Sequence, residues 1–153
     1  MAKPHQQRTI LIADDEPEIL DLMRMMLEWE NYAVVETRDG EQCLEQARAI
    51  KPDLILSDVR MPKMTGLEVL EHLKADPDLS GIPVIMLSVV TTLPQVRTAL
   101  ERGAIAYLPK PFEMREMARL VNRVLTRDAG GREVIRQQAL RDLGLDSQAR
   151  GRT

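Results

Sequence analysis

The chain has 153 residues, of which 44% are hydrophobic, and its 24 acidic and 21 basic side chains leave a net charge of -3. This length and composition are typical of one globular domain and exclude a disordered chain, while the small negative charge gives no reason to expect broad binding to nucleic acid. The single cysteine, Cys43, excludes an internal disulfide and suits a reducing compartment.

The N-terminal segment, residues 1–8, is polar and lacks the apolar core of a signal peptide. No run of the sequence approaches the ~20 apolar residues that a membrane span needs. We therefore expect a cytoplasmic protein that does not bind membranes. We expect residues 1–8 to be a disordered tail, residues 9–126 a folded domain, and residues 127–153 a C-terminal extension.

Short apolar runs typical of buried strands alternate five times with apolar residues at helical spacing. The expected strands are residues 9–13, 32–37, 54–56, 83–87 and 105–108. The expected helices cover residues 17–27, 39–50, 65–73, 93–101 and 114–124. This alternation predicts an α/β fold: a flavodoxin-like, doubly wound, five-stranded parallel sheet of order 2-1-3-4-5 with five helices on its two faces.

Polar residues follow four of the expected strands at the point where each strand ends. They are Asp14 and Asp15 after the first, Asp58 after the third, Ser88 after the fourth and Lys110 after the fifth. The carboxyl ends of parallel strands share one edge of the sheet, so these side chains should lie together. Crowded carboxylates raise one another's pKa unless they are neutralised, and a hard divalent cation such as Mg²⁺ would do this. Acids, a cation and a hydroxyl around a metal favour a phosphoryl group as ligand, and a carboxylate can itself form an acyl phosphate.

On these residues the chain resembles the receiver domain of bacterial two-component response regulators. The resemblance extends from about residue 8 to residue 126. Any one of its motifs is weak, but together they occur in order, each at a strand end: Asp14-Asp15-Glu16-Pro17, Asp58-Val59-Arg60-Met61-Pro62, Leu87-Ser88 and Tyr107-Leu108-Pro109-Lys110-Pro111-Phe112.

The resemblance implies that Asp58 accepts a phosphoryl group from a histidine kinase or a histidine phosphotransfer protein. Asp14 and Asp15 would hold Mg²⁺ (or Mn²⁺), together with Asp58 and the backbone carbonyl of Arg60. A purely structural interpretation of Asp58 is a turn residue, and Asp14 and Asp15 could merely favour a helix N-terminus. However, two consecutive acids that face a third carboxylate are an electrostatic cost without a structural benefit.

The resemblance also implies a phosphate-sensing switch. Ser88 would donate a hydrogen bond to a phosphoryl oxygen, and Lys110 would pair with another. Tyr107 stands where the family keeps an aromatic residue that swings inward as the hydroxyl residue moves, so the loop after Ser88 and residues 91–101 would be the bistable element. The structural alternatives are a core aromatic for Tyr107, a strand-end polar residue for Ser88 and a solvated surface residue for Lys110.

Two departures from the family pattern bear on function. Val89 and Val90 follow Ser88 where the family usually keeps a small residue. We expect their side chains, with that of Arg60, to narrow access to Asp58 and slow the gain or loss of phosphate. In addition, residues 103–106 include Ile105 and Ala106 where winged-helix members place acidic residues. The family's usual dimer on the face of the fourth helix, fifth strand and fifth helix is therefore in doubt, although that face could still serve a partner.

Beyond Thr126, the residues left are too few for a DNA-binding or cyclase output domain. Residues 128–131 should break the last helix of the domain, and residues 134–143 favour a short amphipathic helix that ends near Gly144, followed by disorder. Arginines outnumber acidic residues here. This helix could fold back on the acidic domain, pair two subunits or dock a partner, and we favour packing or self-association over nucleic-acid binding.

We therefore expect a stand-alone receiver that signals through protein contacts, with a homodimer possible, without direct nucleic-acid binding and without turnover as an enzyme. One alternative is the receiver module of a larger regulator whose output domain, for transcription or cyclic-nucleotide signalling, lies outside this chain. A second alternative is a phosphatase that uses the same aspartate and Mg²⁺ chemistry, although its loops look too short for a substrate lid.

Overall fold

The computed structural model describes the backbone of residues 7–151 and the side chains of residues 7–144 apart from Val90. Most of the expected tail over residues 1–8 lies outside the described residues, as does the side chain of Val90. The disorder of that tail and the effect of Val90 on access to Asp58 therefore stay predictions. Within the described part of the chain, no helix is both long enough and apolar enough to cross a membrane.

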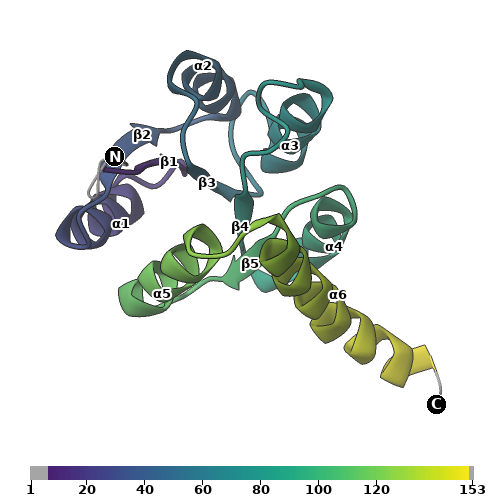
Figure 1. Ribbon diagram of the computed structural model, residues 1–153. Helices are drawn as coiled ribbons and strands as arrows, with labels where there is room; N and C mark the ends of the chain where they lie inside the picture. The colour runs from purple at the N-terminus through teal and green to yellow at the C-terminus, as the bar shows by residue number, and fades with distance from the viewer. Residues whose placement is uncertain (1–6, 152–153) are drawn as a thin grey trace.

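A five-stranded parallel sheet of order β2-β1-β3-β4-β5 forms the centre of the molecule, which confirms the predicted fold class (Figure 1). The central strands β3 and β4 are buried along their whole length, whereas β2 and β5 are the edge strands. Their bounds are β1 Thr9–Ala13, β2 Ala33–Thr37, β3 Leu54–Asp58, β4 Val84–Ser88 and β5 Ala106–Pro109.

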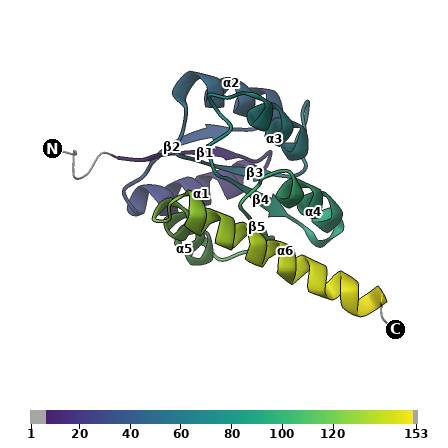
Figure 2. The same ribbon diagram turned by 45° about the vertical axis from the view of Figure 1, so that its right-hand side comes forward.

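Helices cover both faces of the sheet (Figures 1 and 2). The helices α1 and α5 pack together on one face, and α2, α3 and α4 lie in sequence on the other. Their bounds, with that of the short 3-10 helix η1, are α1 Pro17–Trp29, α2 Gly40–Ile50, α3 Gly66–Ala75, η1 Val90–Thr92, α4 Leu93–Glu101 and α5 Met114–Leu125.

Alternation along the strands divides the core between these two layers. In β1, Leu11 belongs to the cluster under α2, α3 and α4, whereas its neighbours Ile10 and Ile12 belong to the cluster under α1 and α5. Successive side chains of a strand point to opposite faces, so a strand buried on both sides must be apolar throughout. This explains the continuous apolar runs from which the strands were predicted.

The C-terminal helix differs most from the expectation. The break after α5 is present, but α6 spans Ala129–Gly151, so it is not short and does not end near Gly144. Gly130 and Gly131 belong to its first turn, where the Asp128 carboxylate accepts a hydrogen bond from the Gly131 N–H at 2.8 Å. A glycine inside a helix costs only about 1 kcal/mol, so neither this pair nor Gly144 has to end it.

Candidate functional site

Strand register brings the predicted polar residues to one edge of the sheet. Ala13 is level with Ser57, Asp58 with Leu87, and Ser88 with Pro109. Because all four strands run in the same direction, the residues that follow them or end them meet at their carboxyl ends. Asp14, Asp58, Ser88 and Lys110 are therefore neighbours here, as the sequence predicted.

Lys110 links the carboxylates of two strands. Its Nζ donates to Asp14 Oδ2 at 2.6 Å and to Asp58 Oδ2 at 2.9 Å, and it lies 3.7 Å from Glu16 Oε1. Its backbone N–H donates to the Ser88 carbonyl at 2.6 Å, which ties the β5–α5 loop to β4. Burial alone would lower the pKa of Lys110, but hydrogen bonds to Asp14 and Asp58 outweigh it and raise that pKa. Lys110 therefore stays charged between two acids.

Asp58 ends β3 with only 8% of its surface exposed. Burial raises the pKa of this carboxyl group and the charge of Asp14 adds to the increase, whereas Lys110 and the Arg60 N–H, which donates to Oδ1 at 3.2 Å, oppose it. The net pKa lies above the ordinary value of 3.8. Asp58 thus has one oxygen held by a cation and the other by a backbone amide.

Three consecutive acids form a carboxylate cluster beside this pair. Asp14, Asp15 and Glu16 each place a carboxylate oxygen within 4.8 Å of the others, with Asp14 fully buried and the other two exposed. Such a set of oxygen donors fits a hard divalent cation. Glu16 was not among the predicted ligands, although its place in an unbroken acidic run before Pro17 was a usable signal.

The hydroxyl of Ser88 lies buried at the end of β4, the strand next to β3. Among the described side chains, its Oγ is the one buried polar atom without a hydrogen-bond partner. Most buried polar atoms in proteins are hydrogen-bonded, because leaving one unpaired costs free energy. An orphan hydroxyl next to Asp58 is therefore suited to donate to a ligand bound there.

Gly66, the first residue of α3, is a further part of the site that was not among the predicted residues. A Cβ at this position would collide with the carbonyl oxygen of Asp58. The Gly66 N–H also donates to the Val59 carbonyl at 2.9 Å. Glycine here allows the loop that follows Asp58 to fold tightly against β3.

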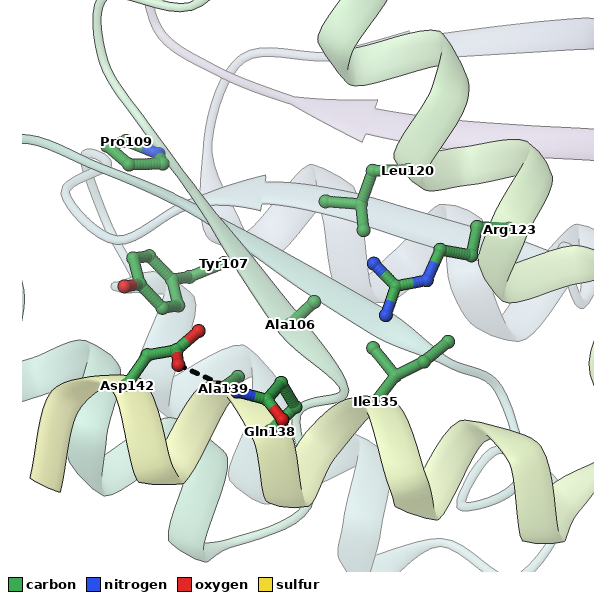
Figure 3. A pocket seen from close by; sticks show the side chains of 9 residues that line it. All are labelled: Ala106, Tyr107, Pro109, Leu120, Arg123, Ile135, Gln138, Ala139 and Asp142. Carbon is green, nitrogen blue, oxygen red and sulfur yellow. Dashed lines mark hydrogen bonds between the residues drawn. The ribbon is translucent and has the colours of Figure 1, made fainter. Parts of the chain in front are cut away.

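The remaining predicted residues lie around this centre. Arg60 is exposed, with its backbone close to Asp58, and Val89 is 39% exposed beside Lys110 in a shallow hollow of about 300 Å³. Tyr107 is half-buried, and its side chain lines an open groove between β5 and α6 (Figure 3). The contact of α6 with the region of Tyr107 could not be read from the sequence, since it depends on how the C-terminal helix folds back.

The fold and this arrangement of acids, lysine and hydroxyl define a class. The family model of the response regulator receiver domain matches residues 10–122. The chain belongs to the family of response regulator receiver domains, which confirms the resemblance seen in its motifs.

Curated relatives and solved structures agree with this assignment. The chain is 35% identical over 122 residues to the DNA-binding response regulator MtrA of Mycolicibacterium smegmatis, with 80% of this chain and 52% of the relative covered. It is 38% identical over 120 residues to the alkaline phosphatase synthesis transcriptional regulatory protein PhoP of Bacillus subtilis, with 78% and 49% covered. The chain therefore spans about half the length of the curated relatives it matches.

Among solved structures, the chemotaxis response regulator CheY4 of Vibrio cholerae superposes with a TM-score of 0.71 at 29% identity, covering 78% of this chain and 99% of that one. The signal receiver domain of a signal transduction histidine kinase from Syntrophus aciditrophicus has a TM-score of 0.71 at 33% identity, covering 80% and 96%. The chain shares the receiver fold with both of these structures.

Proposed function

We propose that this receiver domain accepts a phosphoryl group on Asp58. A carboxylate oxygen of Asp58 would attack phosphorus and form an acyl phosphate, while the bond from phosphorus to the donor's histidine nitrogen breaks and its electron pair stays on that nitrogen. The observation that carries this proposal is the meeting of Asp58, Lys110 and the orphan hydroxyl of Ser88 at one sheet edge. The donor would be a histidine kinase or a histidine phosphotransfer protein.

Lys110 and Ser88 would stabilise the transferred group. Lys110 already lies against Asp58, so a small movement of its flexible chain would allow it to pair with a phosphoryl oxygen. The Ser88 hydroxyl would donate to another oxygen and gain the partner that it lacks. Tyr107 would follow the movement of Ser88 and report it to the surface.

The donor set fits a divalent cation, Mg²⁺ or Mn²⁺, as the predicted cofactor. Asp14 and Asp15, whose carboxylates cluster with that of Glu16, would hold it together with Asp58, which shares Lys110 with Asp14, and the backbone carbonyl of Arg60. When bound, the cation would neutralise negative charge on the carboxylates and the phosphoryl oxygens. The protein's own contribution is to keep these acids crowded, with Lys110 as their internal counter-ion.

The state of Asp58 would be passed on by protein contacts. The likeness to MtrA and PhoP, of which the chain covers about half, supports the alternative of a receiver module in a larger regulator. Detection of the native protein by mass, at the size of 153 residues or larger, separates these two cases. The absence of direct nucleic-acid binding and the cytoplasmic location stay predictions from the sequence.

We further propose that the protein does not turn over as an enzyme. The hollow beside Lys110 is shallow and bordered by Glu16, Val89 and Phe112, with no separate lid segment among the described residues that line it. Steady hydrolysis of a phosphate ester by the purified protein would instead support the phosphatase alternative.

The direct test is incubation with acetyl phosphate and Mg²⁺ followed by intact mass measurement, with Asp58→Asn as a parallel sample. We expect one added phosphoryl group on the parent and none on the variant. Asp53→Asn, which changes an exposed aspartate at the opposite end of the sheet, is the matched control and should be modified like the parent. Modification of Asp58→Asn would contradict the assignment of the acceptor.

A further inference from the structure

The C-terminal helix α6 lies along the β5 edge of the sheet, between α4 and α5 (Figures 1 and 2). Among the described side chains of this helix, those of Ile135 and Ala139 are buried. Ile135 joins the core under α1 and α5, and Ala139 joins the core under α2, α3 and α4. The helix therefore touches both layers and covers an edge strand that would otherwise be exposed.

Two arginines of α6 attach it to the ends of neighbouring helices. Arg132 Nε donates to the carbonyl of Val124 in α5 at 3.0 Å, and Arg136 Nη1 donates to the carbonyl of Leu100 in α4 at 2.6 Å. Each carbonyl also accepts a backbone N–H from just beyond its helix, Leu100 from Gly103 at 3.2 Å and Val124 from Arg127 at 3.3 Å, and the guanidinium supplies a second donor. Arg136 is also held by Glu133 at 2.6 Å.

The packing beneath α6 is incomplete. An open groove of about 210 Å³ lies between part of α6 and the elements β5 and α5, with Tyr107 and Leu120 on one side and Gln138 and Asp142 on the other (Figure 3). Because this groove opens to the surface, only part of the underside of α6 is packed against the domain. The helix is thus docked through the buried Ile135 and Ala139 and the two arginines, while Gln138 and Asp142 stay exposed at the rim of this groove.

We propose that α6 is an intramolecular cover of the face formed by α4, β5 and α5, and that phosphorylation of Asp58 releases it. The inference rests on the proposed function, because it needs Asp58 to be phosphorylated. It also gives the C-terminal helix a role as the element that the switch controls.

Two structural connections lead from Asp58 to α6. The first connection runs along the chain: Ser88 is the last residue of β4, η1 begins two residues later, and α4 follows directly. The Leu100 carbonyl in α4 accepts the hydrogen bond from Arg136. A shift of α4 as Ser88 engages the phosphoryl group would distort this hydrogen bond. In parallel, movement of the Tyr107 side chain toward Ser88 would remove one wall of the groove and weaken the support of α6. Both changes favour the undocked helix.

Cysteine labelling can measure this release. The chain's own Cys43 is buried, and burial raises the pKa of its thiol to about 12, so it should react slowly. A variant Ala139→Cys places a thiol on the buried side of α6, and Val134→Cys places one at a position that is 65% exposed on the same helix. Without phosphate, we expect Ala139→Cys to react much more slowly than Val134→Cys.

Acetyl phosphate and Mg²⁺ should then accelerate labelling of Ala139→Cys by about fivefold or more, the size of a typical coupling between sites, and leave Val134→Cys unchanged. Intact mass of the same samples reports phosphorylation. An added phosphoryl group without faster labelling would overturn this inference alone, whereas no added phosphoryl group would overturn the proposed function and the inference with it. Equal rates for the two variants before phosphorylation would show that α6 is not docked, and would also overturn the inference.

A second variant tests the anchor directly. Arg136→Gln in the Ala139→Cys background removes the guanidinium that reaches the Leu100 carbonyl. We expect faster labelling before any phosphate is added, because the docked state loses a charge-assisted hydrogen bond. An unchanged rate would count against the proposal that this contact holds the cover in place.

Discussion

Lys110 and Asp14, separated by 96 residues in the chain, form an ion pair of 2.6 Å in which the Asp14 side chain has no exposed surface. Removing one partner of a buried pair leaves the other charge without compensation. Lys110→Met should therefore lower the free energy of unfolding at neutral pH by about 3 kcal/mol, as measured by urea denaturation.

Lys63→Met is the control for this loss. Lys63 is 59% exposed and lies 3.7 Å from Asp39, so its removal should cost less than about 1 kcal/mol. Equal losses in the two variants would show that the Lys110 cluster is no more important for stability than a surface ion pair.

Ser88→Ala should separate stability from function. The Ser88 hydroxyl is buried without a partner, so its removal should leave the protein as stable as the parent or more stable by about 1 kcal/mol. Phosphorylation by acetyl phosphate should nevertheless become slower. By contrast, Ser57→Ala removes a buried hydroxyl that donates to the Asp58 carbonyl at 3.0 Å and should destabilise by about 1 kcal/mol. Thermal unfolding and intact mass measure the two effects.

Asp58→Asn should alter the dependence of stability on pH. Burial raises the pKa of Asp58 in the folded state above its ordinary value of 3.8, so its ionisation disfavours folding. The variant should have a higher free energy of unfolding at pH 7 than the parent. This gain should shrink as the pH falls through the raised pKa and vanish below about 3.8, where the parent carboxyl is protonated in both states. A gain that instead increases on acidification would contradict the raised pKa.

Val89→Ala should change the kinetics of phosphorylation. Val89 is 39% exposed and borders the hollow that leads to Lys110, so a smaller side chain should open the approach to Asp58. We expect the gain or the loss of the phosphoryl group to become several-fold faster in an acetyl phosphate time course. Val134→Ala on α6 is the remote control. Identical rates for the parent and Val89→Ala would refute the proposal that the Val89 side chain narrows access to Asp58.

Gly66→Ala should damage the site through the backbone. The added methyl group would meet the carbonyl oxygen of Asp58, so the variant should lose about 1–3 kcal/mol of stability and phosphorylate more slowly. Gly81→Ala is the matched control, since a Cβ at Gly81 meets nothing within 4 Å. Comparable effects of the two substitutions on unfolding and on modification would show that the close approach at Gly66 is unimportant.

Much of the site could be predicted because its residues stand at the ends of strands. Asp14, Asp58, Ser88 and Lys110 each follow or end an apolar run, and a parallel sheet necessarily gathers such positions at one edge. Strand ends differ from the expected ones by a residue or two; Pro109, for example, is the last residue of β5 rather than the residue that stops it. Such shifts do not change the edge of the sheet at which these residues lie.

The sequence by itself determined the parallel sheet and the acids, hydroxyl and lysine at its carboxyl edge, because apolar periodicity and the direction of the strands depend on local order along the chain. Only the tertiary structure decided that Lys110 bridges Asp14 and Asp58, that Ser88 Oγ has no partner, and that α6 continues past Gly144 and covers β5. The bridging by Lys110, the unpartnered Ser88 hydroxyl and the covering of β5 depend on distances between segments far apart in the chain, which packing sets. The length of α6 could not be read from the sequence because a glycine does not have to end a helix.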